Sequence, residues 1–107
     1  MRSAKRERLE RAGWKVGTVR QFLGLSEEEE VFLELKLALA RSLRERRARR
    51  GMTQAQLARL IASSQSRVAK MEAGDRTVSL DLLVRSLLAI GTSKRELAQI
   101  IAPRRAA

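Results

Sequence analysis

The sequence contains no cysteine, histidine or tyrosine, and its aromatic residues are two phenylalanines and one tryptophan. Without cysteine there is neither a disulfide framework nor a thiolate metal ligand. Without histidine the commonest general base and metal ligand is missing. These absences exclude cysteine- and histidine-dependent hydrolase sites, zinc fingers and related zinc sites. We therefore expect a protein that is not an enzyme and that holds no metal and no cofactor.

Proline and long apolar runs are also scarce. The one proline, Pro103, lies beside the C-terminus, so no interior segment is broken by proline, which favours an all-α chain. No run of 18 apolar residues is present to span a membrane. The basic N-terminus lacks the apolar core of a signal peptide. We expect a cytoplasmic, nucleoid-associated protein with no membrane partner.

What the sequence has in excess is positive charge. It carries 23 Lys and Arg against 12 Asp and Glu, a net charge of +11 over 107 residues. The length allows one domain. Such a charge favours nucleic acid, an anionic membrane face or an acidic partner. Residues 41–50 alone contain six arginines and one glutamate. A solvated helix face is the alternative, but like charge at this density favours a binding role, and we expect some of these arginines to contact phosphates.

Residues 53–74 are the most informative segment, because they predict two short helices joined by a tight turn. Thr53 and Ser64 are each suited to cap the start of a helix. Apolar residues follow each cap at helical spacing and would face inward: Leu57, Ala58, Ile61, Val68 and Met71. This is the outline of a helix-turn-helix.

The second helix would expose small, polar and cationic side chains. These are Gln65, Ser66, Arg67, Ala69 and Lys70. In the major groove of DNA, Gln pairs with adenine, Arg or Lys pairs with guanine, and a small apolar group meets the thymine methyl. We therefore predict base contacts by four of these residues, namely Gln65, Ser66, Arg67 and Lys70.

The segments 51–58 and 64–74 resemble the Xre and lambda-repressor-like family of DNA-binding domains, and the resemblance extends from about Leu39 to Ile101. It implies an all-α, five-helix helix-turn-helix domain, here with an N-terminal helical extension. Ala73 departs from the Asn that the family often carries at this variable helix end.

The resemblance also implies site residues. Gln54 would clamp a DNA phosphate, although an exposed glutamine that only opens a helix is the alternative. Arg47 would form a structural ion pair with Glu72. The full set of expected phosphate contacts is Thr53, Gln54, Ser64, Arg49, Arg50 and Arg76. For Arg76, a merely solvated side chain is the alternative.

We divide the chain into an N-terminal extension (1–25), the helix-turn-helix domain (26–102) and a tail (103–107). Ser26 and Glu29 form a capping box that opens a long helix. Residues 31–39 partly alternate like a strand, but their composition favours helix. This helix has two apolar stripes, so the second needs a cover, either residues 14–25 or another subunit. Later helices begin after Ser79 and Ser93, and the last should place Leu97, Ile100 and Ile101 in the core.

The N-terminal extension and the short length resemble antitoxins of the Xre type, which repress their own operon and neutralise a toxin, often a ribonuclease. Trp14, Phe22 and Leu25 are our candidate partner surface, or else they pack onto the main domain. The partners expected are double-stranded DNA, a second copy of the chain and a ribonuclease-type toxin. The alternatives are a module dominated by protein binding, or a basic amphipathic membrane binder.

Overall fold

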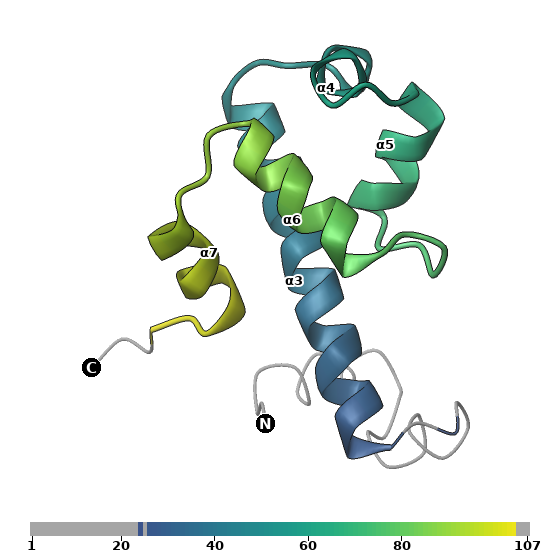
Figure 1. The fold of residues 1–107 in the computed structure, drawn as a ribbon, viewed down its shortest axis with the longest axis vertical. Helices are drawn as coiled ribbons and strands as arrows, with labels where there is room; N and C mark the ends of the chain where they lie inside the picture. The colour runs from purple at the N-terminus through teal and green to yellow at the C-terminus, as the bar shows by residue number, and fades with distance from the viewer. Residues whose placement is uncertain (1–23, 25, 105–107) are drawn as a thin grey trace, which may run out of the picture. The chain divides into compact units, whose positions relative to one another are not determined.

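The computed structural model describes residues 24 and 26–104 (Figure 1). Within these ranges the chain forms five helices and no strand, so the predicted all-α, five-helix fold is confirmed. The helices are α3 (Glu27–Arg49), α4 (Gln54–Leu60), α5 (Gln65–Glu72), α6 (Leu80–Ala89) and α7 (Lys94–Ile101).

Each helix begins directly after a hydroxyl residue, which satisfies amide groups that would otherwise lack a partner. The side chain of Ser26 accepts a hydrogen bond from the backbone N–H of Glu29, whose carboxylate accepts one from the backbone N–H of Ser26. The remaining caps are Thr53, Ser64, Ser79 and Ser93. The sequence positions of these hydroxyl residues thus determine where the helices start.

The charges of α3 are arranged to complement the helix dipole. Its first turn carries the acidic residues 27–30, and its last turn carries Arg46, Arg47 and Arg49. Acid at the N-terminus and base at the C-terminus are both favourable. A compact unit begins within this helix, at Glu34.

The core of that unit is a single cluster contributed by all five helices and by the segment before α6. Its buried apolar members are Leu39, Ala40, Leu43, Leu57, Ala58, Val68, Met71, Val78, Leu83, Leu87, Ile90 and Leu97. Ile100 is partly buried against this cluster, whereas Ile101 is 49% exposed. The prediction that Ile101 lies in the core was wrong, because α7 is short and Leu97 and Ile100 occupy its inward face.

A tight turn joins α4 to α5. It is closed by a hydrogen bond of 2.7 Å from the backbone N–H of Ser63 to the carbonyl of Ala58. Ala62 has a φ of 55°, and it is the one residue other than glycine in the described chain with a positive φ. None of the helices in the described ranges has both the length and the apolar character needed to cross a bilayer.

Candidate nucleic-acid interface

Helix α5 has one face in the core and one in solvent. Val68 and Met71 are fully buried, three residues apart, so they anchor the same side of the helix. The rest of the helix surface is largely exposed and carries Gln65, Ser66, Arg67 and Lys70. The fold therefore gathers all four predicted base-contacting residues on one short, accessible helix.

The start of α5 adds hydroxyl groups to this face. The hydroxyl of Ser64 accepts a hydrogen bond of 3.2 Å from the backbone N–H of Arg67 and lies 3.4 Å from the hydroxyl of Ser66. A capping serine keeps its own O–H as a donor. Ser64 and Ser66 together therefore offer donors for phosphate oxygens or base edges at the N-terminal end of the helix.

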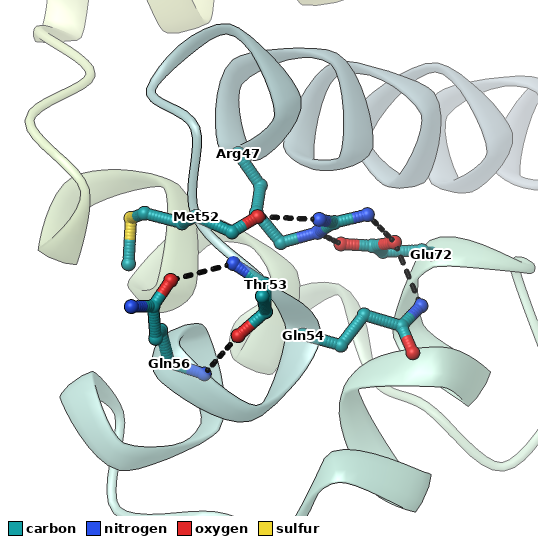
Figure 2. Close-up of polar contacts among 6 residues, drawn as sticks. All are labelled: Arg47, Met52, Thr53, Gln54, Gln56 and Glu72. Carbon is teal, nitrogen blue, oxygen red and sulfur yellow. Dashed lines mark hydrogen bonds and ion pairs between the residues drawn. The ribbon is translucent and has the colours of Figure 1, made fainter.

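An ion pair ties α5 to α3 (Figure 2). The guanidinium of Arg47 donates to both carboxylate oxygens of Glu72, with Nη2 3.0 Å from Oε1, and also donates to the backbone carbonyl of Met52 at 2.7 Å. The side chains are 14% and 4% exposed, respectively. The hydrogen bond to Glu72 raises the pKa of Arg47 above its ordinary value. The negative charge of Glu72, at the end of α5, is therefore balanced by Arg47 of α3.

Helix α4 joins the same network through its first residue. The amide Nε2 of Gln54 donates to Oε1 of Glu72 over 3.1 Å (Figure 2). The preceding cap is closed in both directions, since Thr53 Oγ1 accepts from the backbone N–H of Gln56 and the Gln56 side chain accepts from the backbone N–H of Thr53. The start of α4, the end of α5 and the end of α3 are thus held together by one carboxylate.

Comparison with known proteins agrees with this geometry. A model of the helix-turn-helix domain family matches residues 38–100, more than half of the chain. The chain belongs to the helix-turn-helix domain family. This membership supports a role as a DNA-binding regulator. No curated protein and no solved structure matches the chain.

In this helix-turn-helix domain the loop after α5 presents another exposed cation, Arg76. The carboxylate of Asp75 accepts hydrogen bonds from the backbone N–H and the hydroxyl of Thr77, at 2.8 and 2.6 Å. These bonds lower the pKa of Asp75, and the charges of Lys70 and Lys36 add to the shift. The loop is therefore built around an ionised carboxylate that orders its backbone.

The predicted phosphate contacts Arg49 and Arg50 lie in a different arrangement. Together with Arg46 and Ile90 they line a cleft of about 190 Å³. Arg46 pairs with Glu96 at 3.2 Å, whereas in the described part of the chain neither Arg49 nor Arg50 forms an ion pair. The helix-turn-helix domain therefore has an arginine-rich cleft at the C-terminal ends of α3 and α6, in addition to the exposed face of α5.

The candidate partner surface, Trp14, Phe22 and Leu25, lies outside the described residues. Sequence reasoning missed Lys36, which is 6% exposed and donates to the backbone carbonyl of Arg76 over 3.1 Å. Only its position between Leu35 and Leu37, inside an apolar run, hinted at burial.

Proposed function

We propose that this chain is a sequence-specific transcriptional regulator of the Xre type that reads the major groove of DNA with α5. The observation that carries the proposal is the two-sided character of α5, with Val68 and Met71 in the core and Gln65, Arg67 and Lys70 in solvent. Their side chains supply the hydrogen-bond patterns that recognise adenine and guanine edges. The net charge of +11 supplies non-specific attraction to the duplex.

Residues that flank α5, together with Arg49 and Arg50 of the arginine-rich cleft, are proposed to fix the register on the sugar–phosphate backbone. Contacts of this kind position a protein without reading sequence. The candidates are Thr53, Gln54, Ser64, Arg49, Arg50 and Arg76. For Gln54 the support is its anchoring by Glu72, which holds the amide in one place while leaving its other N–H for an oxygen acceptor.

The direct test is a selection of bound sequences from random DNA, followed by footprinting on the chain's own promoter. We expect a defined motif and a protected segment containing it. Selection that yields no motif, with binding that depends only on salt and DNA length, would contradict sequence-specific recognition.

We further propose that the protein acts as a repressor and as the antitoxin of a toxin–antitoxin pair. Support comes from the resemblance to Xre-type antitoxins, including the N-terminal extension of residues 1–25 that precedes the helix-turn-helix domain. A ribonuclease-type toxin would be encoded by the adjacent gene. Co-expression tests this idea directly: we expect the full chain to neutralise the neighbour's product and the chain lacking residues 1–25 to fail, while it keeps some DNA binding.

A homodimer on a two-fold symmetric operator is also proposed. One recognition helix reads only a few base pairs, too few to select a site in a genome. Pairing doubles the sequence that is read and separates the half-sites by about one helical turn, roughly 34 Å. The exposed side of α7, with Ile101 49% exposed, is a candidate surface, and the second apolar stripe of α3 is another. Light scattering at tens of micromolar protein is the test, and a monomer that protects one half-site would exclude the dimer.

A further inference from the structure

Lys36 is the buried charge whose role in a helix-turn-helix domain is least obvious. It lies on α3 two residues before the segment that matches the family, and it is 6% exposed. Removing an ammonium group from water is costly unless hydrogen bonds compensate. A leucine at this position would bury apolar surface at no such cost. The ammonium group must therefore do something that a leucine side chain cannot.

What the ammonium does is hold the loop that follows α5. Nζ of Lys36 donates to the backbone carbonyl of Arg76 over 3.1 Å, across 40 residues of sequence. The carbonyl therefore points toward α3, while the side chain of Arg76 remains exposed. Lys36 also lies close enough to the Asp75 carboxylate to contribute to its lowered pKa.

The next residue of α3 contacts the same loop. A Cβ placed on Gly74 would lie 2.6 Å from Cδ2 of Leu37, so the side chain of Leu37 packs directly against the glycine that ends α5. Gly74 has a φ of +70°, a conformation that glycine adopts without strain. Lys36 and Leu37 thus support the loop at two points, its start and its middle, from a part of α3 that precedes the family match.

We propose that Lys36 is a positioning residue for DNA binding, which holds the backbone of Arg76 so that the arginine side chain meets a phosphate. This inference rests on the proposed function, because it requires that Arg76 faces DNA. It assigns to the part of α3 that precedes residue 38 a role in the interface that the matched segment alone would not supply.

The test uses the full chain and the operator obtained by selection, with binding measured over a range of salt. Arg76→Ala serves as the reference for loss of the contact. One phosphate contact changes the slope of log K against log salt by about 0.9. If the contact contributes nothing at 1 M salt, its loss lowers the affinity at 0.1 M monovalent salt by roughly eightfold. We expect Lys36→Met to reproduce that loss. The double variant should bind no more weakly than Arg76→Ala, and Lys36→Arg, which keeps a charged donor, should restore the wild-type slope.

A purely structural role for Lys36 predicts a different pattern. Lys36→Met would then melt at lower temperature yet keep the wild-type salt slope whenever it is folded, and this result would overturn the proposal. If Lys36→Met does not fold, Lys36→Gln is measured instead, together with hydrogen exchange at the backbone amides of Thr77 and Val78. Both amides are hydrogen-bonded to Asp75, and we expect them to exchange faster once the loop is released.

The outcomes also separate this inference from the proposed function. If Arg76→Ala itself leaves the slope unchanged, Lys36 has no phosphate contact to position and the inference fails, while a selected operator motif still supports sequence-specific binding. If selection yields no motif at all, the proposed function fails.

Discussion

The side-chain amide of Gln54 donates to the carboxylate of Glu72 over 3.1 Å, which joins the first residue of α4 to the last residue of α5. Because Arg47 donates to the same carboxylate from α3, the relative placement of the three helices depends on one acidic group that is 4% exposed. The network therefore bears on stability and on DNA binding together.

The Arg47–Glu72 pair should be needed for stability. Replacing either residue by alanine leaves its partner largely buried without its counter-charge, and we expect a loss of about 3–5 kcal/mol in the free energy of unfolding. The double replacement should cost less than the sum of the two single ones, because it leaves no orphaned charge. Urea unfolding monitored by circular dichroism measures all three variants. Strictly additive losses would show that the two groups do not interact.

The exposed face of α5 should determine base preference. Gln65→Ala, Arg67→Ala and Lys70→Ala are each expected to relax discrimination at one position of the operator, by about 1–3 kcal/mol where the lost contact is bidentate. Arg85→Ala, at an exposed arginine on α6, is the matched control and should leave the preference unchanged. Competition binding with single-base operator variants reads out each effect. Unaltered preference in all three α5 variants would exclude α5 as the reading helix.

Gln54 should act on affinity rather than on sequence preference. Gln54→Ala removes a proposed phosphate contact, so we expect weaker binding to operator and to random DNA by the same factor. The ratio of the two affinities, measured at one salt concentration, is the decisive quantity. A change in that ratio would mean that Gln54 contributes to base readout.

Acid should weaken the fold through carboxylates that cap helices and order loops. Glu96 has its pKa lowered, first by the hydrogen bond from the backbone of Ser93 and then by that from Arg46. A carboxylate with a depressed folded-state pKa stabilises the protein above its ordinary pKa, near 4.5. This stabilisation is lost as the pH falls through the folded-state value.

Glu96→Gln keeps an acceptor for the cap but cannot titrate. The difference in melting temperature between wild type and this variant should therefore shrink as the pH is lowered below about 4.5. Glu29 and Asp75 have lowered pKa values as well, so both proteins should still lose stability in acid. A difference that stays constant with pH would show that the charge of Glu96 contributes nothing.

The parts of the fold that sequence alone could predict are those fixed by local chemistry. Hydroxyl residues such as Ser64 and Ser93 indicate helix starts because the cap and its amide partner are three residues apart. Apolar spacing likewise identified Val68 and Met71 as the inward side of α5. Both signals operate within a few residues and do not depend on how the helices pack.

What sequence could not predict depends on contacts between distant segments. The burial of Lys36 is decided by the carbonyl of Arg76, 40 residues away, and no local pattern encodes that distance. The anchoring of Gln54 by Glu72 likewise requires that α4 and α5 are already packed. Ile101 was misplaced for a related reason, since periodicity marks apolar residues but does not say where the last helix leaves the core.

Ala62, whose positive φ lies in the turn between α4 and α5, restricts the angles at which the two helices can meet. At Ala62 the strain of a positive φ, about 1–2 kcal/mol, opposes the gain of about 0.4–1 kcal/mol from a less flexible unfolded chain, relative to glycine. Stability is therefore only weakly affected by the choice of residue. Conformational uniformity is affected more, because glycine would open further backbone regions to the turn and alanine closes them. We therefore expect the wild-type protein to show one sharp set of amide resonances for α5. In Ala62→Gly these resonances should broaden, because the turn between α4 and α5 samples more backbone conformations.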